Sequence, residues 1–136
     1  MVQIDVVYQG ALRTQASHGP SGQTLITDAP VDNQGKGESF SPTDLVATAL
    51  ASCILTLMGI VAERHDVDLK GASARVVKGM ASEGPRRIER LDVQIRVPLQ
   101  PDDKIRAALE KAALGCPVHA TLGGNVAMDV TFEWGA

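Results

Sequence analysis

The chain has 136 residues, which suits one domain, and we expect a single domain over residues 1–136. Hydrophobic residues make up 44% of it, enough for an ordinary core, and the formal net charge of -3 argues against a nucleic-acid-binding surface. The first residues lack the basic start of a signal peptide, so we expect a cytoplasmic protein.

Three strands and a long loop are predicted before the first helix. Residues 2–10 alternate apolar and polar side chains and end at a glycine, and residues 11–18 follow as a second strand. The turn sequence GPSG at 19–22 separates these from a third strand at 23–28, giving an antiparallel meander. Residues 29–40 are rich in Gly, Pro, Asp and Asn and predict a loop of the kind that often carries functional residues.

The clearest element is a helix from Ser41 to about Arg64. Ser41 suits the N-cap, Pro42 the first helical position, and Asp44 completes a capping box. The helix is apolar on nearly all sides, which predicts that it is buried, with sheet wrapped around it. Its apolar run is marginal in length for a membrane span, and we interpret it as a core helix and expect no membrane association.

The second half predicts two strands, two helices and a final strand. Long strands cover 67–80 and 87–99, and the second of them alternates strictly, as a half-buried strand does. An amphipathic helix follows at 101–115, then a short helical turn at 116–124, and the last strand runs over 126–134. The order is β-β-β-α-β-β-α-β, typical of an α+β fold.

Two cysteines are the main candidates for chemistry. Cys53 lies in the middle of the apolar helix, where it is either a small core residue or a nucleophile, and a nucleophile there needs a nearby cation to stabilise its thiolate. Cys116 precedes Pro117 at the start of the short helical turn, where backbone N–H groups favour a thiolate, although it could simply be an N-cap. Neither lies in a C-x-x-C pair, and we expect no metal and no cofactor.

Two charged residues each allow both a structural and a functional interpretation. Arg13 lies in a predicted strand, where it is either solvated or directed at a thiol. Asp44 is explained by the capping box and could also carry a function.

The stretch GKGESFSPTDLVATALASC, followed some sixty residues later by CPVHATLG, resembles the OsmC/Ohr family of thiol-dependent peroxidases. The resemblance includes the G-x-x-R of the N-terminal meander and covers essentially the whole chain. It implies the OsmC-like fold, with antiparallel sheets around a long buried central helix, built as an intertwined homodimer whose two long helices pack together.

The resemblance also implies the roles of individual residues. Cys53 matches the peroxidatic cysteine, which becomes a sulfenic acid, and Cys116 matches the resolving cysteine, which forms a disulfide with it. Arg13 matches the arginine that stabilises the thiolate and orients the peroxide. An external dithiol, in better-known relatives a lipoyl-bearing protein, would then reduce the disulfide. The expected substrate is an organic hydroperoxide.

The sequence departs from the family at one catalytic position. The family glutamate directly follows the proline at the helix start, where this chain has Thr43 and places Asp44 one residue later. Asp44 is therefore the expected substitute, with Glu38 as the alternative. Two other functions remain open on this scaffold: a binding protein for a small apolar ligand, and a redox sensor that lacks efficient turnover.

Overall fold

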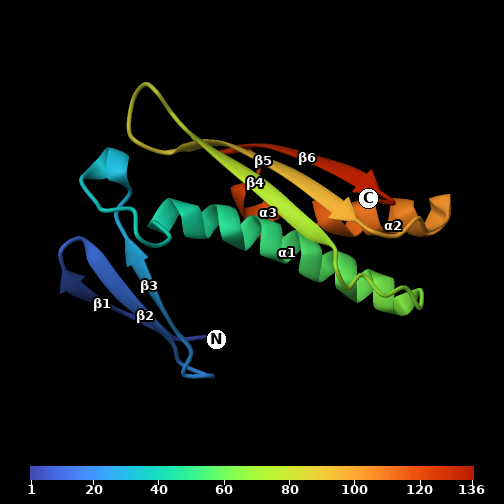
Figure 1. Cartoon of the computed structure of the whole chain (residues 1–136), viewed down its shortest axis with the longest axis horizontal. Coiled ribbons are helices and arrows are strands. Elements are labelled where there is room, and N and C mark those ends of the chain that lie inside the picture. Colours follow the sequence, from blue (N-terminus) through green and yellow to red (C-terminus); the bar gives the residue numbers. More distant parts are fainter. The chain divides into compact units, whose positions relative to one another are not determined.

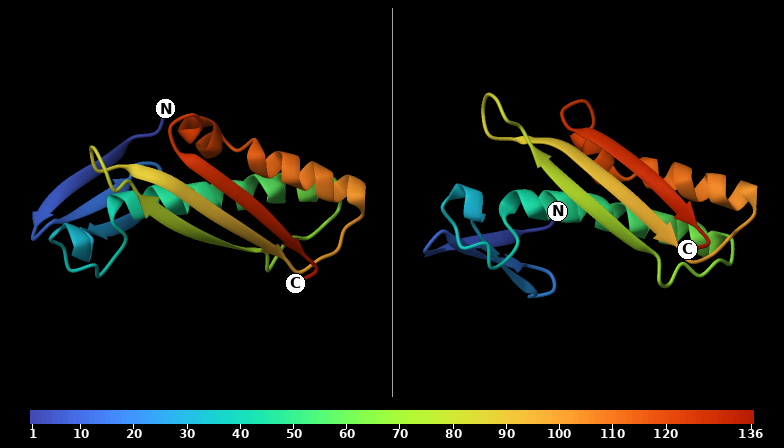
Figure 2. Two further views of the ribbon diagram at one scale, coloured as in Figure 1. Left: turned by 90° about the horizontal axis from the view of Figure 1, so that it is seen from above. Right: turned by 45° about the horizontal axis from the view of Figure 1, so that its top comes forward.

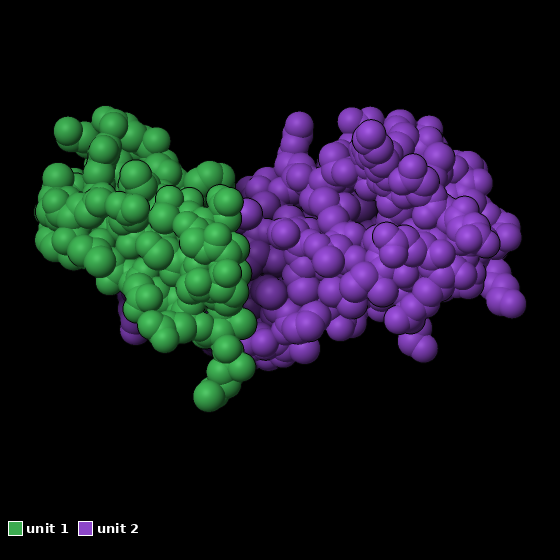
Figure 3. Space-filling view, turned by 90° about the horizontal axis from the view of Figure 1, so that it is seen from below, with its two compact units in different colours: residues 1–46 green, residues 47–136 purple.

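The structure is a computed structural model that describes all of residues 1–136. Its elements in chain order are β1 (Ile4–Gly10), β2 (Arg13–His18), β3 (Thr24–Asp28), the 3-10 turn η1 (Val31–Asn33), α1 (Pro42–Arg64), β4 (Ser73–Met80), β5 (Ile88–Val97), α2 (Asp103–Leu114), α3 (Pro117–Leu122) and β6 (Ala127–Trp134) (Figure 1). The chain divides into two compact units, residues 1–46 and residues 47–136 (Figure 3). The α+β class and the predicted order of elements are confirmed.

Unit 1 contains the predicted meander, with strand order β1-β2-β3 and antiparallel pairing throughout. Gly10 pairs with Arg13, so the hairpin between β1 and β2 turns on Ala11 and Leu12 alone. Both residues have positive φ, 54° and 63°, as a tight two-residue hairpin requires. This conformation usually falls to Asn or Gly, and in Ala and Leu it stores strain of about 1–2 kcal/mol per residue. The strained turn leads directly into Arg13.

The two faces of this sheet differ in chemistry. The register places Ile4, Val6, Tyr8 and Leu25 on one face, all of them exposed, and we call this the apolar sheet face. The opposite face is more polar: it carries Asp5 and Gln15 beside the exposed Val7 and Ile26, with Arg13 and Asp28 at one end. Unit 1 buries no apolar side chain: its buried residues are Thr27, Asp28 and Ser41.

Helix α1 begins with the predicted capping box. The Ser41 backbone N–H donates to Asp44 Oδ2 at 2.9 Å, and the Asp44 N–H donates to Ser41 Oγ at 3.1 Å. In unit 2, one side of the helix is buried at spacings of three and four residues: Ala47, Leu50, Ile54, Met58 and Ala62. Each of the larger side chains stabilises the fold by about 1.5–3 kcal/mol.

Burial of α1 on all sides, as the sequence predicted, is not found within one chain. Its other side exposes Thr48, Ala49, Ser52, Thr56 and Ile60. The reason is that the single chain supplies sheet and helix partners for one side of α1 only. By length and composition α1 could cross a membrane, but the core helix of a soluble protein meets the same criterion.

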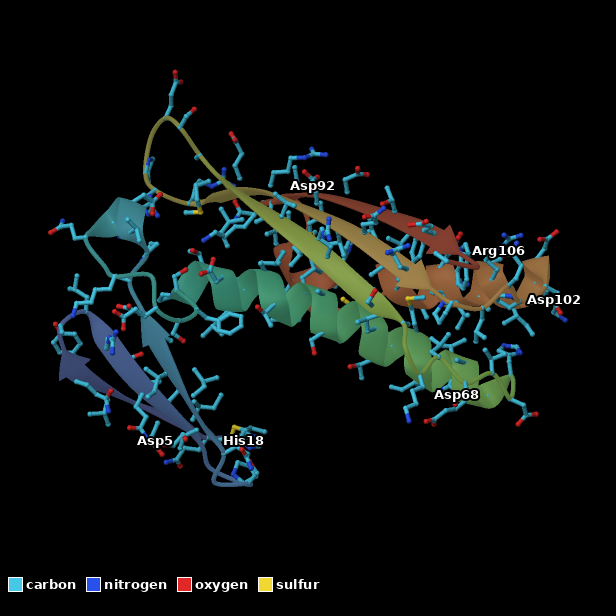
Figure 4. The ribbon with its side chains drawn as sticks, in the orientation of Figure 1. Asp5, His18, Asp68, Asp92, Asp102 and Arg106 are labelled. Atoms are coloured by element: carbon cyan, nitrogen blue, oxygen red, sulfur yellow. The ribbon has the colours of Figure 1, made fainter.

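The second sheet belongs to unit 2 and has the order β4-β5-β6 (Figures 1 and 2). Leu91, Val93, Ile95 and Val97 of β5 are buried, and they form one core with the buried side of α1 and with Leu109 and Ala113 of α2. This confirms the alternation read from the sequence. Asp102 caps α2, accepting the Ile105 N–H at 2.9 Å, with Arg106 one turn further on (Figure 4).

One detail of the predicted sheets is corrected. We expected antiparallel sheets, and β4 and β5 do pair in that way, but β5 and β6 are parallel. The connection from β5 to β6 contains α2 and α3, and such a helical crossover returns the chain to the same end of the sheet before the next strand starts. The second sheet is therefore mixed.

Candidate active site

Cys53 lies near the middle of α1, one turn after Leu50 and beside Ile54. The residue is partly buried and packs against the core cluster of unit 2, so Cys53 lies at the edge of the core. Both interpretations of the sequence therefore stay open, because Cys53 packs as a small apolar residue and yet is not fully buried.

Cys116 is the N-cap of α3, as predicted, and it is fully buried. Its Sγ accepts a hydrogen bond from the His119 backbone N–H at 3.2 Å, and Pro117 occupies the first helical position. We expected this cap to favour a thiolate. The N–H group does lower the pKa of Cys116, but burial outweighs it, so the pKa lies above the ordinary value for a thiol.

The two thiols lie close enough to affect one another. A hydrogen bond with Cys53 and the charge of a Cys53 thiolate both raise the pKa of Cys116 further. Both cysteines are free in this structure. Unit 2 thus brings together one accessible thiol and one sheltered thiol that holds its proton.

Unit 1 places Arg13 between two carboxylates. Its Nη2 lies 2.5 Å from Glu38 Oε2 and 3.5 Å from Asp28 Oδ2. The hydrogen bond and charge of Glu38, followed by the charge of Asp28, raise the pKa of Arg13. Together with Ile26 and Ser39, these three residues line a cavity of about 260 Å³. A fixed cation beside an open cavity suits the recognition of a small polar or anionic group.

The sequence did not single out Asp28. Its Oδ2 accepts the Glu38 backbone N–H at 3.0 Å, and this bond, with the nearby charge of Arg13, holds the pKa of Asp28 below its ordinary value despite burial. The signal that could have found it is cross-strand pairing, because Arg13 lies directly opposite Asp28 in the ladder of β2 and β3.

Of the two candidates for the family glutamate, Glu38 is the one paired with Arg13. Asp44 instead uses Oδ2 in the capping box of α1. The cysteine pair belongs to unit 2, and the cluster of Arg13, Asp28 and Glu38 belongs to unit 1. That Arg13 serves Cys53 therefore stays a prediction.

Replacing Asp44 by alanine is expected to weaken the helix start without removing the chemistry. Loss of the capping box lowers the free energy of unfolding by about 1 kcal/mol. Ser41→Ala, which removes the other half of the box, is the matched control and should have a similar effect. Chemical denaturation measures both, and the rate of thiol oxidation by cumene hydroperoxide should stay within about twofold of the parent. A loss of oxidation in Asp44→Ala alone would support a catalytic role for Asp44.

The chain thus belongs to the α+β proteins with two sheets and two interacting thiols. One thiol lies on the central helix and the other at a helix start. A family model described as OsmC-like protein matches residues 35–131, which include both cysteines and Glu38. The chain belongs to the OsmC family. No curated protein matches it.

Solved structures agree with this assignment. The chain is 46% identical to a Psychrobacter arcticus 273-4 protein provisionally named as an osmotic stress induced and detoxification response protein, with a TM-score of 0.92 over 98% of this chain and 96% of that one. An organic hydroperoxide resistance protein from Legionella pneumophila is 16% identical, with a TM-score of 0.77 over 98% and 96% of the two chains. The organic hydroperoxide resistance protein OhrB of Bacillus subtilis is also 16% identical, with a TM-score of 0.66 over 98% of each chain. The last two show the fold alone.

Proposed function

We propose that this chain is a thiol-dependent peroxidase that reduces organic hydroperoxides. The observation that carries the proposal is the pair of interacting cysteines with unequal exposure, Cys53 partly exposed and Cys116 fully buried. A peroxidatic thiol must meet its substrate, whereas a resolving thiol needs to meet only the oxidised partner. Family membership and relatives named for organic hydroperoxide resistance support the same activity.

The proposed reaction has three steps: oxidation of Cys53, formation of the disulfide and its reduction. The Cys53 thiolate attacks one oxygen of the O–O bond, which breaks, and the alkoxide leaves and takes up a proton to give the alcohol. Cys53 is now a sulfenic acid, oxidised by two electrons. The Cys116 thiolate attacks its sulfur, the S–S bond forms, and hydroxide leaves as water after gaining a proton. An external dithiol then reduces the disulfide and becomes a disulfide itself. The dithiol of a lipoyl protein is one such reductant.

Arg13 supplies the cation in this scheme. A guanidinium stays protonated throughout the working pH range and, beside a thiolate, it opposes the cost of removing that charge from water. Its pairing with Glu38 and Asp28 raises its own pKa and fixes its direction. The apolar surroundings of Cys53 favour an alkyl or lipid hydroperoxide over hydrogen peroxide.

The proposal includes a homodimer in which the two units act as parts of one OsmC-like domain in the cytoplasm. The apolar sheet face and the exposed side of α1 are both unpartnered within one chain. A three-stranded sheet without a buried apolar face is not expected to be stable by itself, and a second copy would cover it.

One equivalent of cumene hydroperoxide, followed by intact mass, thiol count and peptide mapping, tests the function. The expected result is the loss of two protons and a link between Cys53 and Cys116. Two intact thiols in folded protein would contradict the proposal. They would favour the alternative of a binding protein for a small apolar ligand, whereas a single oxidation that dithiols do not reverse would favour a redox sensor.

A further inference from the structure

Asp28 is an unusual residue to find buried. Unit 1 buries no apolar side chain, yet the Asp28 side chain is only 1% exposed. A carboxylate is rarely buried unless it is paired, because it loses its hydration. One of its oxygens, Oδ1, is buried and has no hydrogen-bond partner within the protein. Burying an unpaired carboxylate oxygen costs folding free energy, so its presence points to a role for Asp28 within this polar cluster.

The contacts of Asp28 join three segments of unit 1. Its Oδ2 accepts the Glu38 N–H and also faces the Arg13 guanidinium. Its own N–H donates to the carbonyl oxygen of Phe40 at 3.0 Å, which ties β3 to the end of the loop. The Asp28 carboxylate thus contacts both the Arg13 guanidinium and the backbone of Glu38.

Glu38 makes the shorter contact with Arg13 and contributes more than Asp28 to its raised pKa, but it is the more exposed of the two carboxylates. Its side chain is 59% exposed, so water and salt screen the pair, and holding a long exposed side chain in one rotamer costs entropy. Asp28 is shorter, is shielded from water, and is held by main-chain bonds on both sides. Burial, more than distance, therefore decides which carboxylate fixes the guanidinium.

We infer that Asp28 is the positioning residue of Arg13, anchoring its guanidinium and ordering the Glu38 loop beside it. This deepens the proposed function and rests on it, because Arg13 is the cation of that mechanism. The strained turn at Ala11 and Leu12 fixes the backbone of Arg13 from one side, and Asp28 fixes the guanidinium from the other. Glu38 then completes the cluster as an exposed partner that can be released without loss of the anchor.

A double-mutant cycle on the oxidation rate tests this role. Asp28→Asn keeps an acceptor for the Glu38 N–H but removes the charge that faces Arg13. We expect it to slow the oxidation of Cys53 by cumene hydroperoxide about tenfold in the parent and less than twofold in an Arg13→Gln chain. Glu38→Gln should slow oxidation less than Asp28→Asn does. Asp5→Asn, an exposed acid of the same sheet, is the control and should leave the rate unchanged.

The same slowing in both backgrounds would mean that Asp28 acts on stability alone and would overturn the inference. So would a larger loss in Glu38→Gln than in Asp28→Asn. A parent chain that does not react with the peroxide would contradict the proposed function instead, and the second measurement then decides the inference.

That second measurement is NMR of protein carrying 15N-labelled arginine, which needs neither activity nor folding of the Asp28 variant. We expect the Nη2–H signal of Arg13, assigned by its loss in Arg13→Gln, to stay resolved and slow to exchange in Glu38→Gln, because Asp28 still holds this nitrogen of the guanidinium. If that signal disappears in Glu38→Gln, Glu38 is the anchor and the inference is wrong.

Discussion

Replacing Cys53 by serine is expected to abolish the reaction with organic hydroperoxides, with a loss of at least about a thousandfold in rate. A serine hydroxyl is somewhat smaller than a thiol and has neither its acidity nor its nucleophilicity, so the first step has no nucleophile. Because Cys53 is only partly buried, the change should leave the free energy of unfolding nearly unaltered. Stopped-flow measurement of thiol loss and of peroxide consumption checks the rate.

Cys116→Ser is the matched comparison, and it should separate the two thiols by role. It should leave the first oxidation intact and remove the disulfide, so the protein stops after one equivalent of peroxide with a sulfenic acid at Cys53. A 1,3-diketone reagent traps that acid and marks the site by mass. Equal peroxide consumption in Cys53→Ser and the parent would end the assignment of Cys53 as the nucleophile.

The interaction between the thiols also suggests why they react in order. Part of what raises the pKa of Cys116 is the hydrogen bond with Cys53 and the charge of a Cys53 thiolate. Oxidation of Cys53 to the sulfenic acid removes that charge. The pKa of Cys116 then falls, because burial still raises it and the His119 N–H still lowers it, but the charge of Cys53 no longer acts. The Cys116 thiolate then forms more easily, at the step in which it attacks the sulfenic acid. In the proposed mechanism, Cys116 therefore keeps its proton until Cys53 has reacted.

Local sequence patterns predicted local structure well. The capping box of α1, the N-cap at Cys116 and the alternation of β5 all depend on residues within a few positions of one another. The parallel pairing of β6 depends instead on where a long crossover returns the chain, and no local pattern carries that information.

The same distinction explains what was missed in the candidate site. Asp28 looks like the polar end of a strand, and its importance appears only when the register sets it opposite Arg13 and the loop brings back the Glu38 N–H. The family pattern directed attention to Asp44 because it is the acid nearest to the proline at the helix start, two residues after Pro42. Its carboxylate takes part in the capping box of α1, and its catalytic role stays a prediction.

Disrupting the apolar sheet face is expected to have the second large effect, on assembly. Val6 and Val7 are neighbours on β1 and almost equally exposed, 61% and 64%, but they point to opposite faces of the sheet. In a two-fold dimer Val6→Lys places a charge in the interface twice. With at least about 1.5 kcal/mol lost per copy, the dissociation constant should rise about 100-fold or more.

Val7→Lys is the matched control for this prediction. It introduces the same residue one position further along the same strand, on the face that carries Asp5, Gln15 and the Arg13 cluster. Sedimentation equilibrium over a range of concentrations should find the parent and Val7→Lys as dimers and Val6→Lys shifted toward monomer. A monomeric parent would contradict the dimer. A lysine weakens the dimer only where it lies on a face that contacts the partner. An equal shift in both variants would therefore mean that the opposite face of the sheet is buried in the dimer as well.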